Sequence, residues 1–191
     1  MQPIRLGILG STRGTSLQPI IDAIREQRLS ASIQSVISNK ADAFILQRAT
    51  EQGITAQFID SKDISRENYD KKISNLFRAC QVDLIVLIGY MRILSGIFIE
   101  EWRNKMINVH PSLLPAFGGG MDKNVHQAVL DSGVKETGCT VHYVTETVDA
   151  GPILIQKKCA VKTDDTVESL KARVQQLEGE ALIQAIESFR T

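Results

Sequence analysis

This chain of 191 residues has few cysteines and prolines and no excess of charge of either sign. The three cysteines, Cys80, Cys139 and Cys159, lie far apart and form no C-x-x-C pair, which indicates reduced thiols and argues against a structural zinc site. With only 5 prolines and 13 glycines, the sequence excludes collagen-like repeats and low-complexity disorder. The 22 basic side chains equal the 22 acidic ones, which excludes a strongly polycationic nucleic-acid binder.

Long hydrophobic runs are also missing. The longest, at residues 84–91, stops at Arg92 and is far shorter than the ~20 residues that span a bilayer. The first five residues lack the apolar stretch of a signal peptide. We therefore expect a cytoplasmic protein without membrane or nucleic-acid partners. Because no exposed apolar seam stands out, we expect a monomer or a weak homodimer.

Apolar residues make up 43% of the chain, and a chain of this length buries roughly 70% of its unfolded surface on folding. Apolar runs of strand length alternate with stretches of helical period, which is typical of a parallel sheet covered on both faces. The unalternating Val/Leu/Ile run at 82–88 belongs in the centre of that sheet. Strands are expected at residues 4–9, 32–37, 54–59, 82–88 and 106–109, and helices at 16–28, 41–52, 65–79, 97–102 and 125–130.

The last third of the chain has a different pattern. Two β-rich segments, 139–144 and 153–161, are separated by too few residues for a helical crossover, so they are expected to be antiparallel. One amphipathic helix follows the acidic cap that ends at Thr166. We predict one domain, residues 1–191, with a Rossmann-like α/β fold. It has a mostly parallel twisted sheet, helices on both faces and an antiparallel C-terminal strand pair.

The loop at residues 10–16 lies between the first expected strand and the first expected helix. Backbone N–H groups and the helix dipole attract an anion such as phosphate at this position. The glycines of the loop match neither G-x-G-x-x-G nor the P-loop pattern, which argues against a dinucleotide or a nucleoside triphosphate. A tight turn that needs a glycine with positive φ explains the same residues equally well.

Asn108 and His110 are two residues apart, so on an extended strand they face the same way. An amide donor beside an imidazole suits stabilisation of an oxyanion, and histidine can move a proton near neutral pH. The alternative is a structural pair in which His110 caps a turn. The other histidines, His126 and His142, lie in an expected helix and strand and are interpreted as packing or surface residues.

Asp149 lies in the turn between the two late strands, where it could be an ordinary turn-forming residue. If the fold brings it beside His110, its negative charge favours the imidazolium form, and the two make a paired acid and base. Three separate loops would then meet at strand ends, where open α/β sheets bind ligands.

Three segments taken together resemble the folate-dependent formyltransferase family: Asn-Val-His-Pro-Ser-Leu-Leu-Pro at 108–115, Asp-Ala-Gly-Pro at 149–152 and Met-Arg-Ile-Leu at 91–94. Within the family, the sequence is most similar to enzymes that act on glycinamide ribonucleotide, with matching segments in order from Ile4 to about Glu178. The resemblance implies transfer of a formyl group from 10-formyltetrahydrofolate, as co-substrate, to the amine of glycinamide ribonucleotide in purine (IMP) biosynthesis. It implies neither a metal nor a covalent enzyme intermediate.

The resemblance also implies roles for individual residues. Asn108 and His110 would hold the oxyanion of the tetrahedral intermediate, while Asp149 would keep His110 protonated and help to relay a proton. The residues matching the folate site are Arg66, Met91, Arg92, Ile93, Leu94 and Asn108. Those matching the ribonucleotide site are Gly14, Thr15 and Ser16, at the phosphate, and Glu178.

Three positions depart from the family pattern. Ser16 stands where the family usually has asparagine, in a loop that also carries an uncommon Arg13. The glycine-rich segment at 118–123 replaces a shorter, histidine-containing loop of many members. Gly179 follows Glu178 at a position where the family often has histidine.

Related enzymes offer competing interpretations. Formyltetrahydrofolate hydrolase uses a similar core with water as acceptor but carries an N-terminal regulatory domain, whereas the first strand here is expected from residue 4. Methionyl-tRNA formyltransferase adds a C-terminal domain for its tRNA, and this chain ends at Thr191 without a basic extension. We therefore expect small-molecule substrates. A non-catalytic module that binds a phosphoribosyl ligand is disfavoured because Asn108, His110 and Asp149 occur together.

Overall fold

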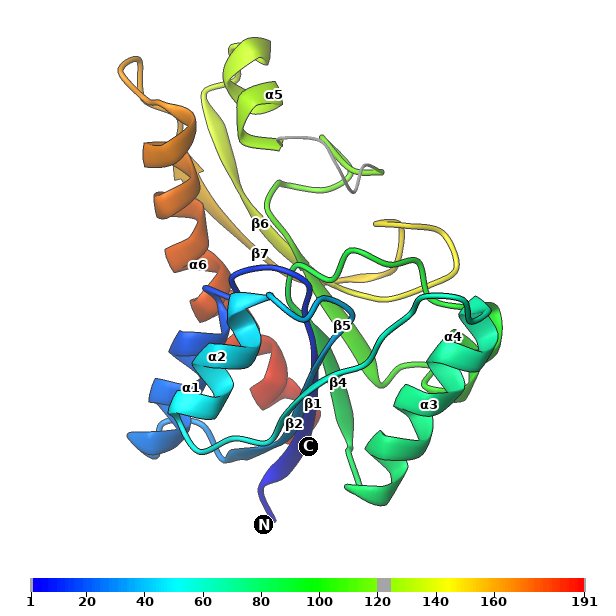
Figure 1. Ribbon diagram of the computed structural model, residues 1–191. Coiled ribbons are helices and arrows are strands. Elements are labelled where there is room, and N and C mark those ends of the chain that lie inside the picture. The colour runs from blue at the N-terminus through cyan, green and yellow to red at the C-terminus, as the bar shows by residue number, and fades with distance from the viewer. Residues whose placement is uncertain (1, 120–124, 191) are drawn as a thin grey trace.

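A computed structural model describes residues 2–119 and 125–190. Within these residues the strands form one sheet in the order β3-β2-β1-β4-β5-β6-β7 (Figure 1). Strands β1 to β5 are parallel where they pair, β6 is antiparallel to β5, and β7 is antiparallel to β6. The strands are β1 (Ile4–Leu9), β2 (Ala31–Ser38), β3 (Ala56–Phe58), β4 (Leu84–Leu87), β5 (Met106–His110), β6 (Glu136–Tyr143) and β7 (Ile153–Ala160).

Helices cover both faces of the sheet. One buried cluster joins α1, α2, α5 and α6 to one face, and a second joins α3 and α4 to the other, as the opposite placement of these groups in Figure 1 shows. The helices are α1 (Leu17–Arg25), α2 (Phe44–Glu51), α3 (Arg66–Ala79), α4 (Gly96–Glu101), α5 (Val125–Ser132) and α6 (Val167–Glu187). No helix of the described residues is both long enough and apolar enough to cross a membrane.

The structure confirms the predicted α/β fold and the antiparallel pair of late strands. Within the run at 82–88, residues Leu84–Leu87 form β4, the middle strand of the sheet. All four residues of β4 are buried. The antiparallel part is larger than expected because β6 also pairs with β5. Residues 120–124 of the glycine-rich loop expected at 118–123 lie outside the described residues.

Several element ends differ from the expected ranges. Helix α2 begins at Phe44 rather than at residue 41, because the chain first makes a turn in which Ala43 N donates to the Lys40 carbonyl. Helix α6 begins as predicted, with Thr166 and Ser169 capping each other's backbone N–H groups. Pro19 lies in the first turn of α1, where its missing N–H costs no hydrogen bond.

The order of the strands reverses between β1 and β4. The chain runs outward from β1 through β2 to β3 and then crosses to the other side of β1. The loops after β1 and β4 consequently meet, and Ser11 N donates to the Gly89 carbonyl at 3.1 Å. Such a switch point at the carboxyl ends of parallel strands is where this class of fold binds ligands.

Candidate active site

A cavity of about 250 Å³ opens at the carboxyl ends of β4 and β5. Most of its lining comes from the loop after β4, the end of β5, strand β6 and the connection between β6 and β7, with single residues from β4, α4 and α5. Its walls are largely apolar, with contributions from Leu87, Ile99 and Val144. Its polar side chains include Arg92, Asn108, His110, His142, Glu146 and Asp149.

Strand pairing places Asn108, His110 and His142 together. Asn108 and His110 lie two residues apart on β5, and β6 pairs antiparallel so that His142 is directly opposite Asn108. The side-chain Nδ2 of Asn108 lies 3.1 Å from Nε2 of His142. Both histidines are buried.

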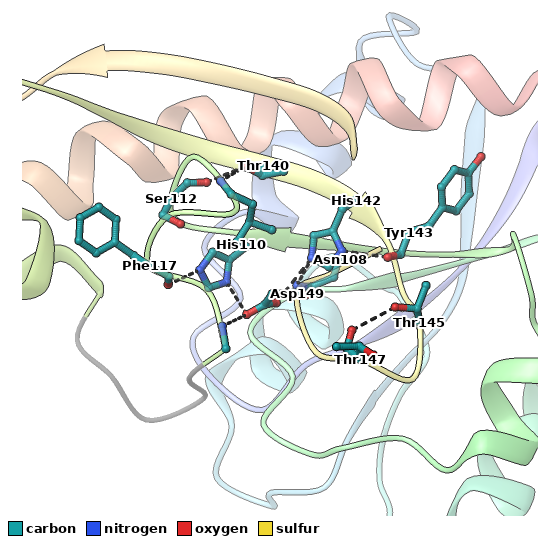
Figure 2. Close-up of polar contacts among 12 residues, drawn as sticks. Asn108, His110, Ser112, Phe117, Thr140, His142, Tyr143, Thr145, Thr147 and Asp149 are labelled. Atoms are coloured by element: carbon teal, nitrogen blue, oxygen red, sulfur yellow. Dashed lines mark hydrogen bonds and ion pairs between the residues drawn. The ribbon is translucent and has the colours of Figure 1, made fainter. Parts of the chain in front are cut away.

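Asp149 lies between the two histidines (Figure 2). Its Oδ2 is 3.3 Å from His110 Nδ1, and its Oδ1 is 3.6 Å from His142 Nε2. The backbone N–H of Gly119 also donates to Oδ2 at 3.1 Å. The resulting chain of contacts, His110–Asp149–His142–Asn108, joins residues that are up to 41 positions apart in the sequence.

The hydrogen-bond partners indicate where the ring protons lie. His142 Nδ1 is 2.9 Å from the Tyr143 carbonyl, which can only accept, so Nδ1 carries a proton, while Nε2 faces both Asn108 Nδ2 and Asp149 Oδ1. His110 Nε2 is 3.1 Å from the Phe117 carbonyl, while its Nδ1 faces Asp149. Both nitrogens of His110 thus face acceptors, an arrangement that only the imidazolium satisfies.

The carboxyl of Asp149 is held in its ionised form. Burial by itself would raise its pKa, but His142, the charge of His110 and the Gly119 N–H outweigh burial and lower the pKa below its ordinary value. The negative charge that the imidazolium needs is therefore present at neutral pH.

The loop after His110 is anchored to the late strands. Thr140 Oγ1 donates to the Ser112 carbonyl at 2.7 Å and accepts from Leu114 N at 3.0 Å. Gln156 Nε2 donates to the Leu114 carbonyl at 2.9 Å. These bonds hold the Pro-Ser-Leu-Leu segment against β6 and β7 and so support the position of His110 from beyond the end of β5.

The segment after β4 is tied down at both ends. Met91 N donates to Ser11 Oγ at 2.8 Å, and Ser95 N donates to Asp70 Oδ2 at 2.6 Å. The Arg92 guanidinium lies 4.4 Å from the centre of the Tyr69 ring. Of the residues expected to contact folate, all those in this segment line the cavity: Met91, Arg92, Ile93 and Leu94. Arg66 is exposed in the first turn of α3 and is not among the lining residues.

The loop at 10–16 forms the expected tight turn. Gly14 has a φ of +60°, and a Cβ there would lie 2.3 Å from Ile45, so glycine is required. The buried Ser16 Oγ donates to Glu178 Oε2 at 2.5 Å, across 162 positions of sequence. The Arg13 guanidinium instead lies over the Phe44 ring, 5.5 Å from its centre. The turn is therefore confirmed, while phosphate binding stays a prediction.

Residues 4–186 match the formyl transferase family. This chain belongs to that family. A bacterial relative, the phosphoribosylglycinamide formyltransferase of Escherichia coli (strain K12), is 40% identical over 169 residues, which cover 88% of this chain and 78% of the relative. The trifunctional purine biosynthetic protein adenosine-3 of Gallus gallus is 42% identical over 96% of this chain. The match covers only 18% of that protein, so this chain spans less than a fifth of the animal trifunctional proteins.

Solved structures share the fold of this chain. Glycinamide ribonucleotide transformylase 1 from Symbiobacterium toebii has a TM-score of 0.92 and 41% identity, covering 98% of this chain and 87% of that one. A formyltetrahydrofolate deformylase from Pseudomonas syringae pv. tomato has a TM-score of 0.87 and 28% identity, covering 98% and 62% of the two chains.

The interpretation of His142 as a packing or surface residue is correct as to its burial but missed its place in the lining of the cavity. His142 is buried, but it contacts Asn108 and faces Asp149. Its register opposite Asn108 could have been found only by aligning the late strand against β5, and the sequence does not specify that pairing. His126, by contrast, is buried in α5 as a packing residue, and burial lowers its pKa to about 4.

We predict that His142→Ala lowers kcat roughly tenfold, because the Asn108 amide loses the ring contact that orients it, a loss worth about one hydrogen bond. Steady-state kinetics would measure the effect. Thermal unfolding of the variant would show whether the fold is kept. A kcat equal to that of the wild type would mean that Asn108 needs no orienting partner.

Among the described residues, no group of three or more His, Cys, Asp or Glu side chains is arranged to hold a metal ion. The contacts of the site are instead hydrogen bonds and ion pairs among Asn108, His110, His142 and Asp149.

Glu178 carries a buried carboxyl with an unusual pKa. Burial raises the pKa to about 7, against the smaller lowering effects of the Ser16 hydrogen bond and Lys171. The folded protein therefore binds this proton more tightly than the unfolded chain does, so stability falls as the pH rises from about 4.5 toward about 7.

We predict that Glu178→Gln is more stable than the wild type at pH 8, by up to about 3 kcal/mol, and that the difference shrinks toward pH 5. Urea unfolding at the two pH values would measure it. A difference that does not vary with pH would contradict the raised pKa.

Proposed function

We propose that this protein transfers the formyl group of 10-formyltetrahydrofolate to the amine of glycinamide ribonucleotide in purine biosynthesis. The observation that carries the proposal is the chain of contacts from His110 through Asp149 and His142 to Asn108 at one cavity. Family membership and the phosphoribosylglycinamide formyltransferase relatives support the same activity.

Asn108 and His110 would stabilise the negative charge of the reaction. Attack by the amine on the formyl carbon forms the new C–N bond and moves the carbonyl electron pair to oxygen. An Asn108 N–H and the His110 N–H on Nε2 are the donors for that oxygen. Nε2 donates to the Phe117 carbonyl, so this carbonyl and the oxyanion would compete for the same N–H group. The loop that carries Phe117 must therefore move its carbonyl away from Nε2 during the reaction.

His110 and Asp149 would also manage the transferred proton. When the intermediate collapses, the bond between the formyl carbon and N10 of the folate breaks. The attacking amine has lost one proton and N10 gains one, so the reaction consumes no net proton. His110, as the imidazolium, can give a proton to N10 as that nitrogen leaves, and the proton that the amine loses restores the imidazolium, while Asp149 stabilises its charge.

The remaining predicted contacts divide between the two substrates. The cavity suits a flat heteroaromatic ring, because apolar side chains form most of its walls, and residues 91–94 line it. We assign this part to the folate, with Arg66 reaching it from α3. We assign the loop with Gly14, Thr15 and Ser16 to the phosphate of the ribonucleotide, at the N-terminus of α1. Glu178, bonded to Ser16, contacts the same substrate.

A cytoplasmic, monomeric or weakly dimeric enzyme that acts on small molecules, without nucleic-acid or membrane partners, fits this proposal. It takes the folate as a co-substrate and needs no metal.

A second candidate activity is hydrolysis of formyltetrahydrofolate, because the deformylase from Pseudomonas syringae shares the fold over 98% of this chain. One experiment separates the activities: folate conversion and formate release are followed with and without glycinamide ribonucleotide. Transfer predicts conversion only when the ribonucleotide is present and no free formate. Formate release without it would support hydrolysis. A protein that binds the ribonucleotide but converts no folate would be a binding module.

A further inference from the structure

Gly179 lies near the middle of α6, directly against Pro19 of α1. A Cβ at residue 179 would lie 2.5 Å from Cγ and 2.6 Å from Cβ of Pro19. Both distances are well inside van der Waals contact, so this approach of the two helices is possible only because residue 179 has no side chain.

The contact cannot be relieved by rotating a side chain. The proline ring is fixed to the backbone of the first turn of α1, so any side chain at residue 179 would push the helices apart. Glycine is also unfavourable inside a helix, because it exposes the backbone and loses the most conformational freedom on folding. The close packing against Pro19 gives a physical reason for a glycine in this position.

Each member of the pair is next to a residue of the buried hydrogen bond between Ser16 and Glu178. Pro19 follows Ser16 by three positions, about one helical turn, and Gly179 directly follows Glu178. The bond is 2.5 Å long, and both side chains are buried, so neither can follow a displaced partner into solvent.

We propose that Pro19 and Gly179 are a matched pair of positioning residues. Together they set the separation of α1 and α6 and thereby hold the Glu178 carboxyl against Ser16, in the part of the site assigned to the ribonucleotide. The pair touches neither reacting atoms nor the folate cavity, so it acts on ribonucleotide binding and not on the chemical step. The expected effect on ribonucleotide binding rests on the proposed function. The expected effect on the hydrogen bond between Ser16 and Glu178 does not.

The test is a double-mutant cycle. Gly179→Ala is expected to raise the KM for glycinamide ribonucleotide about tenfold, the effect of losing one hydrogen bond to a charged group. Its kcat and its KM for 10-formyltetrahydrofolate are expected to stay within about twofold of the wild type, since the pair lies away from the reacting atoms. In the double variant Pro19→Gly/Gly179→Ala, residue 19 has neither the Cγ nor the Cβ that the new methyl group would meet, and the ribonucleotide KM is expected to return to near the wild-type value.

Gln176→Ala is the matched control, because Gln176 is exposed on the same helix and the change also favours helix formation. It is expected to leave both KM values unchanged. If Gly179→Ala does not fold, recovery of folding in the double variant supports the pair, and failure of the double variant to recover overturns it.

Crystal structures separate this inference from the proposed function. Gly179→Ala is expected to show Ser16 Oγ and Glu178 Oε2 more than about 3.5 Å apart, beyond hydrogen-bond distance, and the double variant is expected to restore the bond. An intact bond in Gly179→Ala overturns the inference whatever the enzyme does. If the wild type transfers no formyl group while the bond breaks and returns as expected, the proposed function fails and the structural pairing stands. Unchanged ribonucleotide KM in an active Gly179→Ala enzyme also overturns the inference.

Discussion

Replacing His110 with alanine is expected to reduce kcat by roughly two to three orders of magnitude, as is replacing Asn108, because each change removes one donor to the oxyanion. A lost donor of this kind typically costs about 3 to 4 kcal/mol of activation free energy. Steady-state formyl transfer at saturating concentrations of both substrates would measure the loss.

The control for both variants is Glu136→Ala, an exposed position at the far end of β6 from His142, which is expected to keep wild-type turnover. Thermal unfolding would verify that His110→Ala and Asn108→Ala keep their fold. Wild-type-like turnover in either variant would refute its role as an oxyanion donor.

The second large effect is expected for Asp149→Asn, which keeps the size of the side chain but removes its charge. His110 then loses the anion that faces Nδ1, and the rate is expected to fall by roughly two to four orders of magnitude, the range of a lost acid–base partner. NMR of the labelled His110 ring at a fixed near-neutral pH is expected to show a changed Nδ1 signal, because that nitrogen loses its charged partner. An unchanged imidazole signal would contradict the pairing.

The same substitution has a consequence for stability. The pKa of Asp149 is lowered in the folded protein, so ionised Asp149 adds stability above its unfolded pKa. That contribution disappears as the pH falls through the lowered folded pKa. Asp149→Asn should therefore be less stable than the wild type at neutral pH, with the difference shrinking in acid. Urea unfolding across this pH range would measure it, and a constant difference would point to lost packing instead.

Much of the fold could be predicted from local sequence patterns. The apolar run that forms β4 indicated a central strand, since a strand covered on both faces needs apolar residues at every position. The short connection between β6 and β7 required antiparallel pairing, because no crossover fits in it. Element ends were less predictable: the start of α2 depends on a turn at Lys40 that competes with helix formation.

The candidate site was predictable in part. The spacing of Asn108 and His110 placed them on one side of a strand, and the structure brings Asp149 to His110. His142 was missed because a histidine in an alternating strand carries no local signal. The bond between Ser16 and Glu178 joins the residue that precedes α1 to the middle of α6, and no local sequence pattern relates residues 162 positions apart.

The sequence by itself determined the alternation of strands and helices, the family, and the residue types able to bind an oxyanion and move a proton. These depend on periodicity and on motifs within a few positions of each other. Only the tertiary structure decided that His142 lies opposite Asn108, that Asp149 lies between two histidines, and that Gly179 packs against Pro19. Contacts of this kind depend on strand register and helix separation, which are set by the packing of the whole core and not by neighbouring residues.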